Sequence, residues 1–335
     1  MAVAQVRDVA ALAGVSPATV SNALNHPAKV AAATLLRIHA AIDELGFVRN
    51  DAARQLRAGQ NHSVGMLVLD VRNPFFTDVA RGVEDSLAGV NRPLILGNSA
   101  QDPEREQSYL NLFEEQRVAG ILITPVGDVI DRLKRLRERG TCVVLVDRMT
   151  STEGFSSVGT DDHLGGHLAT DHLLKLGRRK ISFLGGPQGI EQVQRRFVGA
   201  QGAVATFGEG DVQATWIGSQ DAMGGRGGAE QLLALPRKQR PDAIFAANDL
   251  IALGVLQALT LAKVRVPEDI ALIGYDDIEF AASAAIPLSS VHQPALELGR
   301  RAAELLLREI AGDNDAEPQH IVFEPTVVIR ESTSL

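Results

Sequence analysis

Hydrophobic positions near the start of the chain recur with the spacing of two short helices. Residues Val6–Ala13 carry apolar side chains at positions i, i+3, i+4 and i+7 of one face. Gly14 follows as a C-cap that can adopt a positive φ, and Ser16 can cap the N-terminus of a second helix. That second helix turns Val20 and Leu24 inward. The pattern therefore predicts a helix, a glycine turn and a second helix.

The outward face of the second helix is small and polar, which is typical of a helix that enters the major groove of DNA. The alternative is an ordinary pair of helices whose polar face meets water, and this stretch alone leaves both open. The candidate DNA contacts in this stretch are Ser16, Pro17, Ala18, Thr19, Ser21, Asn22 and Asn25.

A third helix and a short linker helix follow. The apolar stripe over about Thr34–Leu45 predicts the third helix, and Gly46 ends it. Residues Asn50–Gly59 predict a short helix with Ala53 and Leu56 on one face. Because helix nucleation is unfavourable, we expect this segment to be helical only when something packs on it. The alternative is a flexible linker.

From Val64 onward, short apolar runs alternate with amphipathic helical stretches, which predicts parallel sheets covered by helices on both faces. Two consecutive series of this kind predict two doubly wound lobes with a cleft between them. The expected strands are 64–70, 93–99, 120–125 and 142–148 in the first series, 180–186, 214–218, 242–249 and 270–277 in the second, and a last strand pair near 320–330.

Polar side chains gather where these strands end, and ligands of doubly wound folds bind at such ends. Carboxylates, amides and arginine beside aromatic rings suit a polyhydroxylated ligand, because hydroxyls need partners that donate and accept in one plane. Singly, each of these residues could instead be a turn former or a helix cap. The candidate ligand contacts are Asn73, Phe75, Asp147, Arg148, Arg196, Trp216, Asn248 and Asp276, with Phe76 and Tyr275 as further stacking faces.

Charge is unevenly distributed over the 335 residues, whose net charge is −8. Residues 1–60 hold six Lys and Arg against four Asp and Glu, a net of +2, which leaves −10 for the remainder. A mildly basic N-terminal segment followed by an acidic remainder is consistent with local DNA contact, and we expect dimerisation to double the small positive charge that faces the DNA. The single cysteine, Cys142, lies in an apolar run and permits no disulfide within one chain.

Several other functions find little support in the sequence. The pairs at 161–162 and 276–277 lack further ligands at helpful spacing, so we expect no metal, and glycines 224–228 do not form a dinucleotide-binding motif. We find no nucleophile motif and expect no enzyme and no cofactor. An exported sugar-binding protein would need an export signal and would leave residues 6–59 unexplained. With no such signal and no long apolar run, we expect a cytoplasmic protein without a membrane span.

Taken in order along the chain, a set of short motifs resembles the LacI/GalR family of bacterial transcriptional regulators. The resemblance covers essentially the whole chain, and its specificity comes from the combination. The motifs are Asp8-Val9-Ala10, Ala13-Gly14-Val15-Ser16, Thr19-Val20-Ser21, Asn50, Leu56, NPFF at 73–76, NDxxAxG at 248–254 and GYDD at 274–277.

This resemblance implies an all-α helix-turn-helix module and a hinge helix, followed by a two-lobed α/β core, similar to periplasmic sugar-binding proteins, with doubly wound parallel sheets. It implies a homodimer on a pseudo-palindromic DNA operator, with Asn50 and Ala53 in the hinge and Leu56 wedged between bases of the minor groove. It also implies a small-molecule effector, usually a sugar or sugar phosphate and less often a nucleobase. The residues that match the family's effector site are Phe75, Asp147, Arg196, Asn248 and Asp276.

The chain departs from the family pattern at a few positions. Gln5 and Ala31 replace the usual caps of the first and third helices, and Arg49 replaces a frequent proline. Ile190 and Gln192 make a nucleobase site doubtful. We expect an effector-controlled repressor with a DNA-binding domain, a hinge and a core. The expected bounds are 1–47, 48–62 and 63–335, with one lobe at about 63–160 plus 293–322 and the other at about 163–290 plus 323–335.

Overall fold

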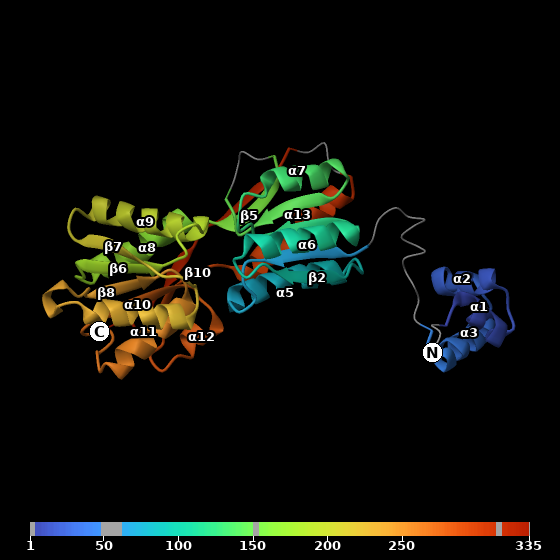
Figure 1. The fold of residues 1–335 in the computed structure, drawn as a ribbon, viewed down its shortest axis with the longest axis horizontal. Helices are drawn as coiled ribbons and strands as arrows, with labels where there is room; N and C mark the ends of the chain where they lie inside the picture. Colours follow the sequence, from blue (N-terminus) through green and yellow to red (C-terminus); the bar gives the residue numbers. More distant parts are fainter. Residues whose placement is uncertain (1–3, 48–61, 150–153, 313–316, 335) are drawn as a thin grey trace. The chain divides into compact units, whose positions relative to one another are not determined.

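The chain divides into two compact units, residues 1–60 and residues 61–335. The computed structural model describes residues 4–47, 62–149, 154–312 and 317–334 (Figure 1). The predicted hinge residues Asn50, Ala53 and Leu56 lie outside this described part, so their roles stay predictions.

The first unit is a bundle of three α-helices with one 3₁₀ turn. Its elements are α1 (Val6–Ala13), α2 (Pro17–Asn25), η1 (Pro27–Lys29) and α3 (Ala32–Leu45). Gly14 adopts φ +64°, which turns the chain between α1 and α2, and the Ser16 hydroxyl accepts from the Thr19 backbone N–H at 3.1 Å. Gln5 begins α1 better than we expected, because the Asp8 carboxylate accepts from its backbone N–H at 2.7 Å.

The core of the first unit follows the predicted apolar faces with two differences. Its buried hydrophobic residues are Val9, Ala10, Ala13, Val20, Ala23, Ile38, Ala41 and Phe47. Val6 is 36% exposed, contrary to our expectation, because it opens α1 and the core lies against the later turns of that helix. Leu24 is only half-buried, and Ala23 takes the central place instead.

The second unit contains two lobes, each built on a six-stranded sheet. The first lobe contains β1 (Val64–Val68), α5 (Pro74–Ala88), β2 (Leu94–Asn98), α6 (Pro103–Glu115), β3 (Gly120–Ile123), α7 (Ile130–Glu138), β4 (Cys142–Val146), β5 (Ser156–Thr160), α13 (Ala295–Ile310) and β11 (His320–Phe323). Its strand order is β2-β1-β3-β4-β5-β11, and all of its pairs are parallel.

The second lobe repeats this plan. It contains α8 (Asp162–Lys175), β6 (Lys180–Gly185), α9 (Glu191–Phe207), β7 (Asp211–Trp216), α10 (Ala222–Ala234), η2 (Arg237–Gln239), β8 (Ala243–Ala246), α11 (Asp249–Leu261), β9 (Ala271–Asp276), α12 (Glu279–Ala282), β10 (Ser289–His292) and β12 (Thr326–Val328). Its strand order is β7-β6-β8-β9-β10-β12, and only β10 and β12 pair antiparallel.

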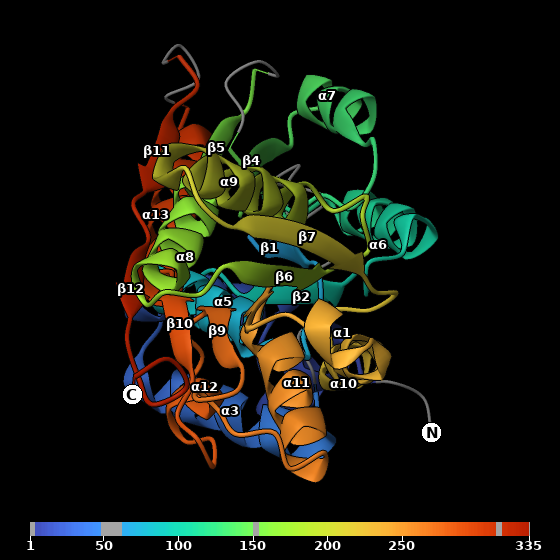
Figure 2. The same cartoon turned by 90° about the vertical axis from the view of Figure 1, so that its left-hand side faces the viewer.

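Helices cover both faces of each sheet, as the continuous apolar runs predicted. In the second lobe α8 and α9 lie on one face and α10 and α11 on the other (Figure 2). In the first lobe α5 packs with α13 on one face, while α6 and α7 contact strands on the other. All residues of β1, β3 and β9 are consequently buried.

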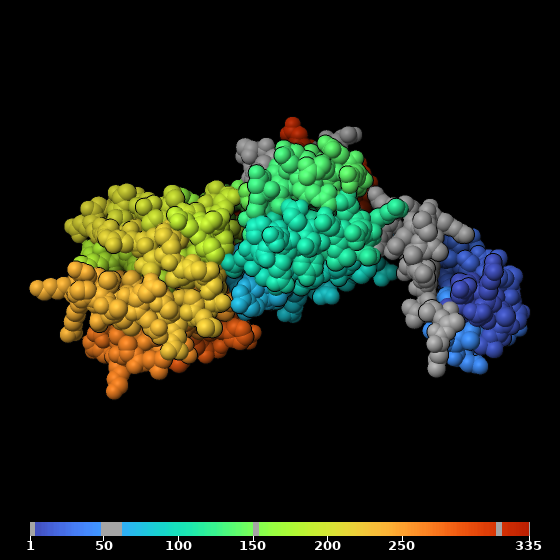
Figure 3. All heavy atoms as spheres, in the orientation of Figure 1, coloured from blue at the N-terminus to red at the C-terminus, as the bar shows by residue number. Residues whose placement is uncertain are grey.

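The chain passes between the lobes after β5, after β10 and between β11 and β12. The last two strands therefore do not form the pair that we expected near 320–330. Each instead adds to the edge of a different sheet, because β5 and β10 present free edges there. The two lobes contact each other along a seam on the face shown in Figure 3.

Candidate functional site

A pocket lies between the lobes, where strands of both sheets end. It contains about 410 Å³ of space outside the protein atoms, including the part open to solvent. Its walls mix apolar side chains with carboxylates, amides and one guanidinium. The lining residues are Leu69, Asp70, Asn73, Phe75, Phe76, Gln101, Asp147, Ile190, Gln192, Val193, Arg196, Gln220, Asn248 and Asp276.

Arg196 is the buried cation of this pocket, and its side chain extends from α9 across the end of the second sheet. Its Nε donates to Asp162 Oδ1 at 2.7 Å, and its Nη1 donates to the Ala247 carbonyl at 2.6 Å. The guanidinium carbon lies 3.6 Å from the centre of the Tyr275 ring, which is a close cation–π contact. Burial alone would lower the pKa of Arg196, but the facing carboxylates raise it, so the side chain stays charged.

Asp276 joins the two lobes at the end of β9. Its Oδ2 accepts from the Asn73 amide of the first lobe at 2.8 Å, and its Oδ1 accepts from Gln293 at 2.9 Å. Arg196 Nη1 lies 3.7 Å from the same Oδ1. Burial raises the pKa of Asp276 to about 6, although Arg196 and the two amide donors lower it. The carboxyl group is thus held in place by two amide donors and faced by a guanidinium, while burial opposes its ionisation.

Asp147 occupies the matching position in the first lobe, directly after β4. Its main-chain carbonyl and its Oδ2 accept from the Gln192 amide of the second lobe at 2.7 and 3.0 Å. Its Oδ1 is buried and has no hydrogen-bond partner among the residues that the structure describes. Burial, and then the charge of Asp162, raise the pKa of Asp147 well above its usual range. Oδ1 is therefore an acceptor that a ligand hydroxyl can satisfy.

Asp147 and Asp276 also share a backbone conformation that side chains seldom adopt. Their φ angles are +55° and +101°, in the region that favours glycine. Aspartate tolerates this region better than most residues, but the conformation still stores strain. Strained residues cluster at functional sites, which supports a binding role for both carboxylates.

Two further ion pairs hold the lobes together at the rim of the pocket. Arg72 of the first lobe pairs with Asp70 at 2.8 Å and reaches Asp221 of the second lobe at 3.2 Å. Arg148 of the first lobe pairs with Glu191 of the second at 3.1 Å. With the contacts of Asp276 and Asp147, these pairs connect the lobes on both sides of the pocket.

Residues of the first unit form the predicted DNA-contacting face. Ser16, Pro17, Ala18, Asn22 and Asn25 are exposed along the start and outer side of α2. The remaining two, Thr19 and Ser21, are half-buried, and the hydroxyls of Ser16 and Thr19 lie 2.9 Å apart. The Asn25 amide donates to the Ser21 carbonyl at 2.8 Å. This small polar face is free of large side chains that would keep α2 away from a groove.

Comparisons with known proteins match both units. Residues 5–50 match the family described as bacterial regulatory proteins, lacI family, and residues 170–333 match the periplasmic binding protein-like domain. The repressor PurR of Aliivibrio fischeri (strain ATCC 700601 / ES114) is 34% identical over 99% of this chain and 98% of its own length. The ribose operon repressor of Escherichia coli K12 is 34% identical over 98% of this chain and 99% of its own. The chain belongs to the LacI family.

Two solved structures of LacI regulators extend this match to the fold. The lac repressor dimer bound to operator and an anti-inducer has a TM-score of 0.83 at 25% identity and covers 99% of each chain. A LacI family regulator from Enterococcus faecium with bound ribose has a TM-score of 0.74 at 30% identity and covers 81% of this chain and 98% of its own. The protein is a DNA-binding transcriptional regulator with a helix-turn-helix domain and a two-sheet α/β core of parallel strands.

Most of the effector contacts that the sequence predicted for this LacI regulator line the pocket together. They are Asn73, Phe75, Asp147, Arg196, Asn248 and Asp276. Arg148 lies outside the lining because it pairs with Glu191 at the rim. Trp216 lies outside it as well, because its ring packs edge-on against Phe197, with centroids 5.6 Å apart.

Asn73 and Asn248 combine the two roles that the sequence left open. Asn73 Oδ1 accepts from the Phe75 backbone N–H at 3.1 Å at the start of α5, and Asn248 Oδ1 accepts from the Ile251 N–H at 2.8 Å at the start of α11. Both residues also line the pocket. Asn73 Nδ2 also donates to Asp276, and Asn248 Nδ2 donates to the Gln220 carbonyl at 3.2 Å. Helix capping and ligand contact are compatible here, because each NH₂ group carries a second donor.

Sequence reasoning missed several contributors to the site. Asp162, which we considered only as half of a metal-binding pair, is the buried counter-ion of Arg196. Tyr275, expected as a stacking face for the ligand, lies under the Arg196 guanidinium. Gln220 lines the pocket without any sequence signal for it, and Gln192, which the sequence marked only as a departure from a nucleobase site, lines it as well. Within the described ranges the structure contains no group of three or more candidate metal ligands and no helix suited to crossing a membrane.

Proposed function

We propose that the pocket binds a small polyhydroxylated effector and that this binding controls how a homodimer of the chain represses transcription from a pseudo-palindromic operator. The observation that carries the proposal is the convergence of Asp147 from one lobe with Arg196 and Asp276 from the other. These groups supply planar acceptors and donors at one point, which suits adjacent sugar hydroxyls. The proposal assigns the pocket to binding and not to catalysis.

The names of similar proteins do not choose between a sugar and a nucleobase as the effector, because they include both PurR and a ribose operon repressor. The pocket itself favours the sugar. Ile190 places an apolar side chain in the wall, and Gln192 commits its amide donor to Asp147. A nucleobase edge would need hydrogen-bonding groups at such positions.

Effector control requires an element with two states. We propose that the hinge segment 48–62 is this element, because a short helix is marginally stable and forms only when packed. Effector binding that changes how the lobes close would change the distance between the hinges of the two protomers. A small change of that kind biases helix formation on the operator, which is how a site in the core can control DNA binding.

Selection of DNA from a random duplex pool, followed by a gel-shift titration at fixed salt, tests this function. We expect the full chain to select a palindrome with two half-sites, and we expect one sugar of a panel to change the affinity for that palindrome. A scrambled duplex of the same composition is the control, because electrostatic binding is independent of sequence. Equal affinity for selected and scrambled duplexes would contradict the proposal.

A further inference from the structure

The balance of charge around the pocket indicates which form of a sugar it can hold. Four carboxylates lie in or directly behind its walls, namely those of Asp70, Asp147, Asp162 and Asp276. Arg196 is the only cationic side chain among the lining residues that the structure describes. Negative groups therefore outnumber positive ones at the place where the ligand would lie.

The single cation in the wall is already engaged by protein groups. Arg196 binds Asp162 and the Ala247 carbonyl and faces Asp276. The aromatic ring of Tyr275 covers one face of its guanidinium. An anionic ligand would have to compete with two buried carboxylates for this cation, and their displacement would leave buried charges unpaired.

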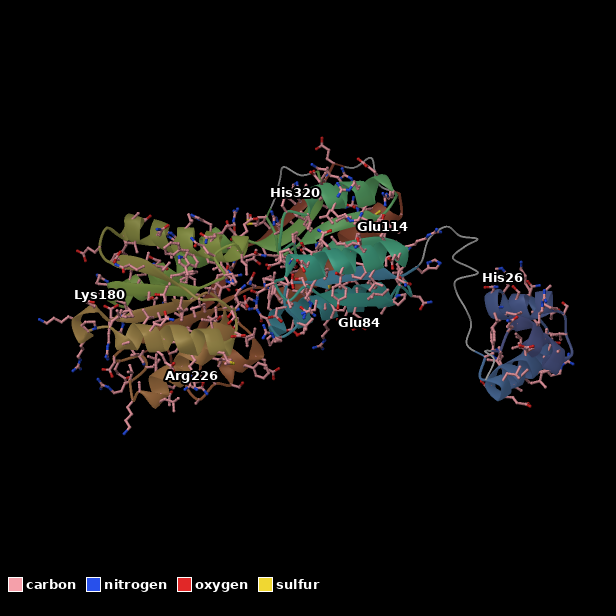
Figure 4. All side chains as sticks on the ribbon, viewed as in Figure 1. His26, Glu84, Glu114, Lys180, Arg226 and His320 are labelled. Atoms are coloured by element: carbon pink, nitrogen blue, oxygen red, sulfur yellow. The ribbon has the colours of Figure 1, made fainter. Side chains whose placement is uncertain are left out.

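The arginines at the rim are also paired. Three donors of Arg72 bind Asp70, and a further donor reaches Asp221. Arg148 pairs with Glu191, which also lies 3.8 Å from Arg195. The described lining residues include no lysine, and Lys180, for example, points outward at the end of the second lobe that is remote from the first (Figure 4).

Helix N-termini could in principle attract an anion to this place, since α5, α9 and α11 begin there. The start of α9 carries the acidic Glu191 in its first turn, and α5 and α11 are each capped by their own asparagine. Asn73 and Asn248 accept backbone N–H donors of their first turns. These capped ends offer few free donors, so they do not offset the carboxylates.

We propose that the pocket accepts an uncharged sugar and rejects its phosphate esters and the corresponding sugar acids. This selectivity rests on the proposed function of the pocket as the effector site. The buried Asp147 Oδ1 has no partner and needs a donor, which a sugar hydroxyl has and a phosphate dianion lacks.

The raised pKa values of the pocket carboxyls agree with this geometry. Burial raises the pKa of Asp147, Asp162 and Asp276, and for Asp147 the Asp162 charge raises it further. Burial is the largest cause of each shift, and the same burial opposes the entry of an anionic ligand, because a charged group loses its hydration there. A phosphoryl-transfer enzyme that phosphorylates the sugar would therefore remove the effector, and the regulator would respond to the substrate of that reaction and not to its product.

Calorimetric titration of the full chain with matched ligand pairs tests the selectivity. The probes are ribose with ribose 5-phosphate, glucose with glucose 6-phosphate, fructose with fructose 6-phosphate, and gluconate. We expect at least one neutral sugar to bind and its phosphate ester to bind at least about a hundredfold more weakly, because the anion would lie against carboxyl groups that outnumber the cations of the pocket wall. A phosphate ester or gluconate that binds as tightly as the neutral sugar would overturn the proposal, as would binding of hypoxanthine with none of the sugars.

Asp147→Asn supplies a variant that removes one negative charge while it keeps the side-chain shape. We expect it to reduce the ratio of the affinity for the neutral sugar to the affinity for its phosphate ester. The control is Asp131→Asn, because 87% of the Asp131 side chain is accessible to solvent. An unchanged ratio in Asp147→Asn would contradict the electrostatic cause. The titration contains no DNA, so it separates the two proposals. If a neutral sugar binds but does not change the affinity of the protein for the operator, the proposed function is contradicted and the selectivity stands. If only the phosphate ester changes the affinity for the operator, the selectivity is contradicted and the proposed function stands.

Discussion

The side-chain amide of Gln192 donates to both the main-chain carbonyl and the carboxylate of Asp147, at 2.7 and 3.0 Å. One donor group of the second lobe thus binds the first lobe at the edge of the pocket. Hydrogen bonds to charged groups contribute about 1.5–3 kcal/mol, so this contact can influence how readily the lobes close.

Replacement of this donor should weaken effector binding. In Gln192→Glu a carboxylate faces Asp147, and we expect effector affinity to fall about tenfold to a hundredfold, because a favourable contact of the closed lobes becomes repulsive. Isothermal titration with the bound sugar measures the change. Gln194→Glu on the same helix is the matched control, since its amide contacts only Gln188. Equal losses in both variants would show that the effect does not come from the Asp147 contact.

Asp147→Asn should raise the stability of the ligand-free protein and lower its effector affinity. The pKa of Asp147 is raised by burial, so the folded state binds a proton more readily than the unfolded chain, whose ordinary value is 3.8. The contribution of Asp147 to the free energy of unfolding is therefore fully present below pH 3.8, and it is lost as the pH rises through the raised pKa of the folded state. The gain in Tm from Asp147→Asn should be small at acidic pH and larger at alkaline pH. A gain that is larger at acidic pH would contradict this assignment.

Loss of the buried cation should destabilise the core far more than loss of its exposed neighbour. Arg196→Ala leaves Asp162 buried without its counter-ion, and removal of one partner of a buried pair costs about 3–5 kcal/mol. Arg195→Ala removes a half-exposed pair with Glu191, for which we expect about 1 kcal/mol or less. Urea unfolding of the two variants side by side provides the comparison. Similar midpoints would indicate that Arg196 contributes to ligand binding alone.

Two glycines of α9 should respond oppositely to alanine. A Cβ at Gly199 would lie 2.0 Å from the His163 carbonyl of α8, so Gly199→Ala must push the two helices apart and should cost about 1–3 kcal/mol or more. The nearest atom to a Cβ at Gly202 is 3.9 Å away, and Gly202→Ala should stabilise the helix by up to about 1 kcal/mol. Thermal melts measure the change in Tm for each variant. Equal changes in Tm would contradict the close packing of α8 and α9.

Leu56→Ala should weaken operator binding while effector binding stays unchanged. The residue matches the family's minor-groove wedge, and loss of that insertion should lower operator affinity at least about tenfold. A gel-shift titration at fixed salt measures the loss, and calorimetry with the sugar verifies the pocket. Leu36→Ala is the control, because Leu36 is a 72% exposed leucine of α3. Unchanged operator affinity would disprove the wedge at this position.

The sequence alone determined the order and type of the elements, because helix caps, glycine turns and apolar periods act over a few residues. The turn at Gly14, the cap at Ser16 and the alternation from Val64 onward all have local causes. The positions of Asp147 and Asp276 at strand ends, and of Arg196 on the helix after a strand, were predictable in the same way, since the ends of parallel strands share one edge of a sheet.

Only the tertiary structure decided the partners of these side chains. Whether Arg196 met Asp162 or solvent, and whether Tyr275 faced the ligand or the guanidinium, depended on contacts between segments distant in the chain. Trp216 ends β7 and Arg148 comes shortly after β4, near strand ends like several lining residues, but they contact Phe197 and Glu191 instead. Strand order and lobe closure involve long-range pairing, and no local pattern carries that information. The sequence therefore determined where polar groups could gather, and packing determined which of them form the pocket.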